Sequence, residues 1–510
     1  MLATVLSGGV SGIEGYIVRV EADVSHGLPS FATVGLGDSA VREGRDRVVS
    51  AIRNSGFSFP MERITVNLAP ADVRKEGAGF DLPVAAGILA ATGQIPADLL
   101  PRVAIAGELA LDGSTRSLSG VLPIAVAAER AGLWGVIVPP ANAREAAAAA
   151  VRVLPAASLA AAARILLGGE PDPLPDDPPD AEPPSVGDVS DVRGQAAVKR
   201  ALEVAAAGGH NLLMIGPPGI GKTMLARRLP AVLPPLTRDE ALTATMIHSV
   251  AGLLPVRSGL MRTRPFRAPH HTISDAGLVG GGRVPRPGEV SLAHGGVLFL
   301  DELPEFRRNA LEALRQPMEE GEVTVTRSMT ATSFPARFML VASMNACPCG
   351  NLGHPKKTCR CAPSVVQRYV ARVSGPLMDR IDIHVHVVPP TFEELEDGSV
   401  PEPAVAVRER VSRARARQAS RAANEGAVNA RLGAAVLRRA LVLSPTARST
   451  VEAAVRKLGL SARAYHKVLR IARTIADLAD SDAIGPEHVG EAVQYRSLDR
   501  LDRTLGLRYD

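Results

Sequence analysis

The feature that most constrains the fold of this chain is a glycine-rich loop between an apolar run and a helical segment. The apolar run covers residues 211–215, and the loop reads Gly216-Pro217-Pro218-Gly219-Ile220-Gly221-Lys222-Thr223. Its spacing matches G-x-x-x-x-G-K-[ST], in which glycines let backbone N–H groups turn inward around a polyphosphate. We expect Lys222 to reach the β- and γ-phosphates of ATP and Thr223 to hold Mg²⁺. A chance Gly/Pro turn is disfavoured because the strand and helix patterns are both present.

Two later apolar runs end in side chains suited to the same chemistry. Residues 297–300 precede Asp301 and Glu302, and residues 338–344 precede Asn345. In this Walker B pattern the first acid orients Mg²⁺ and the second polarises the attacking water. The Asn345 amide is suited to positioning that water. The alternative reading is an acidic strand end, as found in many α/β proteins.

Length and composition bound the number of domains. A chain of 510 residues with 46% hydrophobic and 22% charged residues is globular and long enough for two to four domains. Short β-rich and helical runs alternate over residues 1–170, which predicts a separate α/β domain. The β-rich runs are 13–24, 30–36 and 63–68, and the helical runs are 39–55 and 82–91.

The next two boundaries follow from local composition. Residues 171–186 are rich in Pro and Asp. We expect them to form a linker, because such a stretch buries too little apolar surface to fold. Residues 187–395 contain the phosphate loop and the acidic strand, which predicts an α/β core with a parallel sheet. Residues 396–510 are mainly helical, with helix starts at Pro445 and Pro486.

The order of these motifs resembles that of an AAA+ ATPase of the helix-2-insert group, which includes magnesium-chelatase ATPase subunits and MCM helicases. Three further segments are similar to magnesium-chelatase-like proteins of the ComM/YifB type, namely 266–274, 344–350 and 465–477. The resemblance covers nearly the whole chain outside the linker. It implies an insertion at about 250–290, a pre-sensor-1 hairpin at about 322–336 and a C-terminal helical lid.

The same resemblance assigns roles to particular residues. Asn345 would be sensor 1, and Arg380, in the segment Leu-Met-Asp-Arg-Ile-Asp, would be an arginine finger acting on the nucleotide of a neighbouring subunit. It therefore implies a homo-oligomeric ring, expected to be a hexamer. Arg463 would be sensor 2, although Arg470 and Arg473 follow on the same helix and remain alternatives. The structural alternative is that all three lid arginines cap or solvate the helix.

Residues 1–170 resemble the proteolytic domain of the Lon family, which has a ribosomal S5 domain 2-like fold. The similar segments are 75–89 and 104–113. Phe80 and Asp81 stand where the resemblance would place a serine nucleophile, and no lysine occurs between Lys75 and Lys199. Without an activated nucleophile there is no acyl-transfer chemistry. We therefore expect a Lon-like fold without protease activity.

All four cysteines lie between residues 347 and 361, as two C-x-C pairs in a Gly- and Pro-containing loop. They are Cys347, Cys349, Cys359 and Cys361. Four thiolates suit tetrahedral Zn²⁺ in a structural site, with His354 as a substitute ligand. The alternative is four idle thiols. Clustered thiols also favour a reducing compartment, so we expect a cytoplasmic protein.

Basic residues in two segments are candidate nucleic-acid contacts. Arg327 lies beside the tip of the expected hairpin, and Arg267 and Arg283 lie in the expected insertion. In the resembled group these elements face the central pore, where phosphate contacts give sequence-independent DNA binding. A solvated hairpin and basic loop are the alternative. The arginines of residues 405–423 spread around their helix, which favours a solvated face.

These observations predict a Mg²⁺-dependent ATPase motor, and the resemblance suggests DNA branch migration in recombination or natural transformation. Two other functions remain: the motor subunit of a chelatase that inserts metal into a porphyrin, and a non-motor scaffold that uses nucleotide only for assembly. No membrane association is expected. The Ala-rich stretch at 141–167 contains Arg144, Glu145, Arg152 and Arg164, which prevent it from spanning a bilayer.

Overall fold

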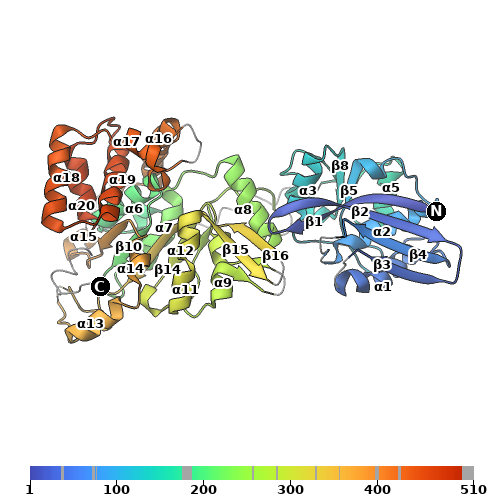
Figure 1. Cartoon of the computed structure of the whole chain (residues 1–510), viewed down its shortest axis with the longest axis horizontal. Coiled ribbons are helices and arrows are strands. Elements are labelled where there is room, and N and C mark those ends of the chain that lie inside the picture. The colour runs from blue at the N-terminus through green and yellow to red at the C-terminus, as the bar shows by residue number, and fades with distance from the viewer. Residues whose placement is uncertain are drawn as a thin grey trace.

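The computed structural model describes most of the chain and shows an elongated molecule with three parts (Figure 1). An amino-terminal α/β domain lies at one end, a second α/β unit lies in the middle, and a helical unit lies at the other end. The described residues are 1–35, 39–71, 75, 77–174, 187–255, 258–282, 285–327, 330–354, 356–396, 401–422 and 427–496. Most of the expected linker at 171–186 therefore lies outside the described residues.

The amino-terminal domain is built on a seven-stranded mixed sheet of order β3-β4-β2-β1-β5-β8-β9. Its strands are β1 (Leu2–Ser11), β2 (Glu14–Ser25), β3 (Ser30–Val34), β4 (Arg63–Ala69), β5 (Val103–Ile105), β8 (Gly135–Val138) and β9 (Arg152–Pro155). A separate short pair is β6 (Glu108–Leu109) and β7 (Thr115–Arg116). The helices are α1 (Ser39–Asn54), α2 (Asp81–Ala91), α3 (Val121–Arg130), α4 (Ala143–Ala146) and α5 (Leu159–Leu166).

Strand β1 was not among the expected strands. It pairs with β2 along its whole length in antiparallel register, from Leu2 opposite Asp23 to Ser11 opposite Glu14. Its residues are small, with Gly8 and Gly9 side by side, so the chain start shows little of the β-branched and aromatic content that marks a strand. The alternation of buried and exposed residues from Leu2 to Val5 nevertheless follows a strand.

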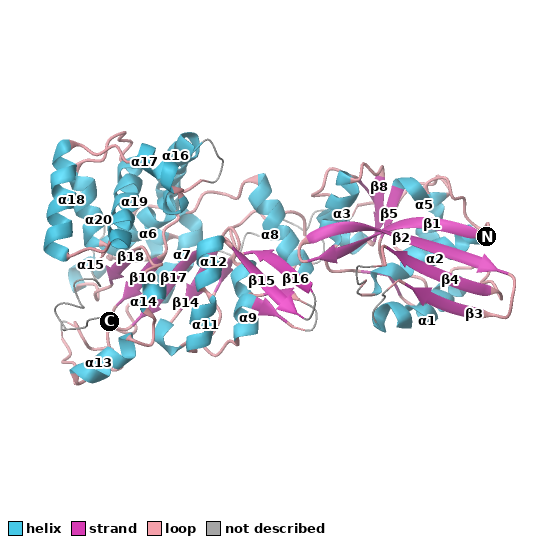
Figure 2. Ribbon diagram, viewed as in Figure 1, coloured by secondary structure: helices cyan, strands magenta, loops and turns pink. Residues whose placement is uncertain are grey.

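The middle unit contains a five-stranded, all-parallel sheet of order β11-β14-β17-β10-β18. These strands are β10 (Leu212–Ile215), β11 (Phe266–Arg267), β14 (Val297–Leu300), β17 (Met339–Met344) and β18 (Ile383–His386). The surrounding helices are α6 (Ala196–Gly208), α7 (Lys222–Val232), α8 (Arg238–Val250), α9 (Asp275–Val279), α10 (Glu289–Leu292), α11 (Arg308–Ala313), α12 (Arg315–Glu320), α13 (Pro363–Val370) and α14 (Gly375–Met378). Figure 2 shows this sheet and the amino-terminal sheet as separate groups of strands.

Three central strands of this sheet are buried along their whole length, as expected of parallel strands covered on both faces. They are β10, β14 and β17. Because all run in the same direction, the residues that follow their carboxyl ends meet at one edge of the sheet. Strand β11 pairs with β14, so residues 266–267 belong to the main sheet and not to the insertion expected there.

Two hairpins project from the middle unit. The shorter pairs β12 (Gly280–Gly281) with β13 (Arg286–Pro287), and the longer pairs β15 (Glu322–Arg327) with β16 (Thr330–Pro335). The longer one confirms the hairpin predicted at 322–336, with Glu322 opposite Pro335 and Arg327 opposite Thr330. Phe334 of this hairpin is fully buried in the apolar core that lies beneath it.

The amino-terminal domain packs directly against α8 and the longer hairpin. The Glu145 carboxylate accepts hydrogen bonds from the Leu122 amide (2.9 Å) and from the Ser249 hydroxyl of α8. The Gly120 amide donates to Ser249 as well. At Gly12, in the turn between β1 and β2, an added Cβ would lie 3.0 Å from the Ser333 carbonyl oxygen of β16. These contacts join the two domains through buried polar groups.

The C-terminal unit is helical, as predicted. It comprises α15 (Phe392–Glu396), α16 (Ala404–Ala422), α17 (Ala434–Ala440), α18 (Pro445–Leu458), α19 (Ala462–Leu478) and α20 (Pro486–Gln494). Helices α18 and α20 begin at the two expected prolines, and the Ser444 hydroxyl caps α18 by accepting from the Ala447 amide. None of the helices in the described part of the chain combines the length and apolarity needed to cross a bilayer.

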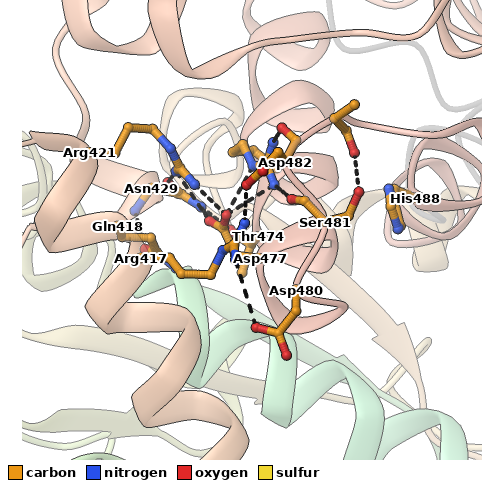
Figure 3. Close-up of polar contacts among 12 residues, drawn as sticks. Arg417, Gln418, Arg421, Asn429, Thr474, Asp477, Asp480, Ser481, Asp482 and His488 are labelled. Atoms are coloured by element: carbon orange, nitrogen blue, oxygen red, sulfur yellow. Dashed lines mark hydrogen bonds and ion pairs between the residues drawn. The ribbon is translucent and has the colours of Figure 1, made fainter.

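Three arginines of α16 bind protein groups, contrary to the solvated face expected from the sequence, whereas Arg413 is exposed as expected. Arg410 pairs with Glu203 of α6, and Arg415 donates to the Ala206 carbonyl. Arg421 pairs with the fully buried Asp477 of α19 (Figure 3). Helical periodicity alone does not reveal these partners, because they come from helices distant in the sequence. The arginines therefore fasten the helical unit to the core.

Candidate nucleotide site and cysteine cluster

The glycine-rich loop connects β10 to α7 in the predicted way. Gly219 and Gly221 adopt φ values of 77° and 89°, a left-handed backbone that favours glycine. The Lys222 ammonium, at the start of α7, is hydrogen-bonded to the carbonyls of Gly216 (2.6 Å) and Pro217 (2.9 Å). It also donates to Asn345 Oδ1 (3.0 Å), at the end of the neighbouring strand β17. Burial lowers the pKa of Lys222, and the charges of the acidic pair oppose that shift.

The metal-binding half of the site is assembled from three segments. Thr223 Oγ1 donates to Asp301 Oδ2 at 2.6 Å, and the Ser343 hydroxyl donates to Asp301 Oδ1. Both carboxylate oxygens are thereby fixed beside the loop. A threonine hydroxyl next to a carboxylate supplies the hard oxygen ligands that Mg²⁺ prefers, so these residues fit that ion. Sequence reasoning missed Ser343, whose signal is a polar residue inside a fully buried strand.

Glu302 occupies a strained position at the mouth of the site. Its φ of 55° and ψ of 50° place a non-glycine residue in the left-handed region. Its carboxylate is about half exposed and lies 3.9 Å from Nδ1 of His271, whose ring meets Phe306 edge-on. His270 bonds the Thr272 hydroxyl in its own loop, but His271 lies beside the candidate base.

Arg380 lies just beyond the C-terminal end of α14. Its guanidinium pairs with Glu319 of α12 and donates to the Pro376 carbonyl, and its side chain is 15% exposed. The Asn211 side chain, immediately before β10, donates to the Arg380 carbonyl (3.0 Å). The structure does not bring Arg380 into contact with Lys222 or Asp301 of its own chain within hydrogen-bond distance. A role for Arg380 in another subunit therefore stays a prediction.

The three candidate sensor 2 arginines on α19 have different surroundings. Arg473 is buried and donates to Asp477 and to the Ser481 and Asp482 carbonyls. Arg470 donates to the carbonyls of Ala430 and Leu432. Arg463 is 76% exposed, with one ion-pair partner, Asp379, at 3.6 Å. Arg463 is therefore the one whose guanidinium is most accessible to a ligand.

The four cysteine thiols converge on one point. All four sulfur atoms lie within 4.8 Å of one another, although the residues span fifteen positions. The hydrogen bond from the Asn351 amide lowers the pKa of the Cys349 thiol to about 6, which favours the thiolate. His354 is not in the cluster formed by the described residues, and its Nδ1 accepts from the amides of Lys356 and Lys357. Four sulfur donors fit a tetrahedral Zn²⁺.

The three arginines predicted to contact DNA differ in their places in the structure. Arg327 is the last residue of β15, next to the hairpin tip. Arg267 forms a two-fold hydrogen-bonded ion pair with Glu289, at 2.6 and 2.7 Å, and so has an internal partner. Arg283 lies outside the described residues.

The Lon-like domain holds a buried ion pair where the resemblance would place a nucleophile. The Asp81 carboxylate, at the start of α2, accepts from Arg47 Nε (2.7 Å) and Nη2 (3.2 Å). Burial raises the pKa of Asp81 to about 6, although Arg47 opposes the shift. A carboxylate enclosed in this way is not available for acyl transfer.

The sheet order, the loop between β10 and α7, and the Asp301–Glu302 pair define a P-loop ATPase of the AAA+ class with a helical C-terminal unit. Three family models, all of magnesium chelatase subunit ChlI, match successive segments of the chain. The magnesium chelatase, subunit ChlI, model matches residues 188–395. The models of subunit ChlI of Mg-chelatase and of the ChlI C-terminal region match residues 20–142 and 401–496.

Individual relatives place the chain more narrowly. It is 43% identical to the competence protein ComM of Haemophilus influenzae over 512 residues, 99% of each chain. It is also 43% identical to the uncharacterized protein YifB of Salmonella typhimurium over 98% of each chain. The 38 kDa magnesium-chelatase subunit of Rhodobacter capsulatus is 27% identical over 31% of this chain. The chain belongs to the ComM/YifB type of magnesium-chelatase-like AAA+ proteins, as the resemblance predicted.

Proposed function

We propose that this protein is a Mg²⁺-dependent ATPase that assembles into a hexameric ring in the cytoplasm and moves DNA strands. The observation that carries the ATPase assignment is the convergence of three strand ends. Lys222, after β10, donates directly to Asn345, after β17, at 3.0 Å. Its neighbour Thr223 donates to Asp301, after β14, at 2.6 Å. This constellation suits binding and hydrolysis of a nucleoside triphosphate.

The proposed reaction is attack of water on the γ-phosphorus of ATP. Glu302 takes a proton from the water as the bond to phosphorus forms, and the bond to the bridging oxygen of ADP breaks. Lys222 and the backbone amides of the loop neutralise charge on the phosphates. Mg²⁺ held by Thr223 and Asp301 supplies further charge stabilisation when bound. Asn345, which contacts Lys222, orients the γ-phosphate and the water.

The proposed ring is supported by the position of Arg380. Its guanidinium lies apart from its own chain's loop, so it would serve a nucleotide held by an adjacent subunit. Arg463 on the lid helix would meet the phosphates of its own subunit's nucleotide. Both assignments are part of this proposal.

The DNA role is supported by the hairpin β15–β16 and by the printed name of one relative, a competence protein. In a ring, Arg327 near the hairpin tip would contact phosphates in the pore. A chelatase motor is the second candidate, favoured by the three chelatase family models. It is weaker, because the chelatase subunit itself matches only about a third of this chain. A non-motor scaffold would not need Glu302.

The deciding experiment measures the ATPase rate with no DNA and with forked, four-way and single-stranded DNA, each at 50 and 200 mM salt. We expect stimulation by DNA at the lower salt and a weaker effect at the higher, because phosphate contacts release counterions. Equal rates with and without every DNA at 50 mM salt, together with no binding, would overturn the DNA assignment. Activity in a chelatase assay with partner subunits would then favour the second candidate.

A further inference from the structure

The cysteine cluster lies in a loop that is attached to the nucleotide site at two places. The loop starts at Asn345, whose side chain accepts from Lys222. Gly350 lies against Pro218 of the phosphate loop: a Cβ added to Gly350 would be 2.6 Å from Pro218 Cδ and 3.1 Å from Cγ. The backbone between two of the cysteines therefore forms a wall behind the phosphate loop.

This loop has two backbone turns and packs Leu352, Cys359 and Cys361 against the apolar core, but it has no regular secondary structure among its described residues. Strand β17 ends at Met344 and α13 begins at Pro363, and the described residues between them form neither helix nor strand. Cys347 is fully buried in the apolar core and its sulfur accepts from the Leu352 amide (3.3 Å), whereas Cys349 is exposed. The sulfur cluster joins the start of the loop at Cys347 and Cys349 to its far end at Cys359 and Cys361.

The sulfur separations match a four-thiolate metal site. They are 3.3 Å between Cys347 and Cys349, 3.7 Å between Cys349 and Cys359, and 3.6 Å between Cys359 and Cys347. Tetrahedral Zn²⁺ with Zn–S bonds of about 2.3 Å sets its ligands about 3.8 Å apart.

We propose that Zn²⁺ bound by Cys347, Cys349, Cys359 and Cys361 holds Gly350 against Pro218, so that metal occupancy sets the affinity for ATP. This inference rests on the proposed function, because it takes the loop at 216–223 to be the ATP site. Metal binding orders a loop whose ligands lie far apart in the sequence, and the ordered loop fixes the backbone that cradles the phosphates. Loss of the metal releases the wall behind Pro218.

Two glycine variants test the contact between Gly350 and Pro218 independently of metal binding. Gly350 and Gly353 have nearly equal φ values, 75° and 77°, but an added Cβ at Gly353 meets nothing within 4 Å. Gly350→Ala and Gly353→Ala therefore impose similar backbone strain in the same loop, and only the first presses on Pro218. We expect both to retain one zinc per chain by elemental analysis. We expect ATPγS to bind about tenfold more weakly to Gly350→Ala than to Gly353→Ala by calorimetry.

The double variant Cys349→Ser/Cys361→Ser tests the metal while sparing the buried Cys347. We expect it to lose zinc and to bind ATPγS at least tenfold more weakly in Mg²⁺ buffer, with the helical lid still folded by circular dichroism. Wild-type protein stripped by a zinc-selective chelator should show the same loss, reversed by added Zn²⁺. Unchanged affinity in zinc-free protein, equal affinity of the two glycine variants, or wild-type protein without zinc would overturn the inference. Zinc-loaded wild type that binds no nucleotide would instead overturn the proposed function.

Discussion

The Arg380 guanidinium forms an ion pair with the Glu319 carboxylate, which lies three residues before the start of the hairpin strand β15. The candidate finger is therefore attached to the base of the element proposed to contact DNA. For Arg380 to reach a nucleotide on another subunit, this pair has to open. Engagement of the neighbouring nucleotide would thus release the base of the hairpin.

The first prediction concerns Arg380→Ala. We expect kcat to fall about 10³-fold, the lower end of what an arginine finger contributes, with little change in ATP binding. Glu319→Gln is the matched control, since it breaks the same pair but keeps the cation, and its kcat should stay within about threefold of wild type. Mixing Arg380→Ala chains with Glu302→Gln chains should restore activity, because one supplies the base and the other the arginine. Full activity of Arg380→Ala as a monomer would contradict the ring.

A second prediction tests Glu302 as the base. Glu302→Gln keeps the size and the strained backbone position but removes the proton acceptor, so we expect hydrolysis to fall by about 10² to 10⁴ while ATP still binds. Glu305→Gln, three residues on and paired with Arg372, should leave hydrolysis nearly unchanged. DNA strand displacement at the wild-type rate by Glu302→Gln would rule out a motor driven by hydrolysis.

A third prediction concerns the lid residue Lys467. Its ammonium contacts the carbonyls of Asp379 and Ile381, on both sides of Arg380, and lies 3.3 Å from the Asp382 carboxylate. Without these bonds the segment that carries Arg380 loses its fixed position, and small misplacement of a catalytic group costs up to about 10²-fold. We expect Lys467→Met to lower kcat by about 10- to 100-fold with a smaller change in KM. Arg456→Met, on the exposed face of α18, is the control.

Doping experiments show whether Lys467 acts across the subunit boundary. Wild-type chains mixed with Glu302→Gln chains should lose less activity than wild-type chains mixed with the Glu302→Gln/Lys467→Met double variant. The first partner still lends a correctly held Arg380, and the second does not. Equal inhibition by both partners would show that Lys467 acts only within its own subunit.

The fourth prediction is acid sensitivity caused by His294. Burial, together with the nearby charges of Arg337 and Arg431, lowers the pKa of His294 to about 4, and its Nδ1 accepts from the Arg337 amide (3.2 Å). The unfolded chain binds this proton near pH 6.5, so the stabilisation is complete above that pH and is lost as the pH falls toward 4. The loss at pH 5 is about 2 kcal/mol.

Urea denaturation of the core at pH 7.5 and pH 5.0 measures this effect. His294→Asn keeps an acceptor for the Arg337 amide but does not titrate, so its stability should fall less between the two pH values than that of wild type. His26→Asn, at a fully exposed side chain, should match wild type. The same pH dependence in wild type and His294→Asn would contradict the assignment.

Local patterns predicted much of the fold and the centre of the site. The phosphate loop, the acidic pair after β14 and the hairpin each depend on short sequence spacing, which residue patterns report directly. Strand β1 was missed because its glycines conceal a strand, and β11 was missed because two residues give no periodicity. Strand β1 is held by β2, which follows it directly, and by the distant β5, and β11 is held by the distant β14.

The parts of the site that sequence reasoning missed are contacts between distant segments. Ser343 fixes Asp301, His271 lies beside Glu302, and Glu319 holds Arg380. Each pair is more than thirty positions apart, so no spacing within one element reveals it. Arg410, Arg415 and Arg421 of α16 were expected in solvent and instead bind buried acids or a carbonyl from helices distant in the sequence.

The contact between the amino-terminal domain and strand β16 has a mechanical consequence. Gly12 leaves room for close approach of the two backbones, and Phe334 anchors the neighbouring part of that strand in the core. If the hairpin moves as the proposed function requires, this domain would either move with it or slide against it. In the proposed motor, the amino-terminal domain would therefore add its mass and its contact surface to any movement of this hairpin.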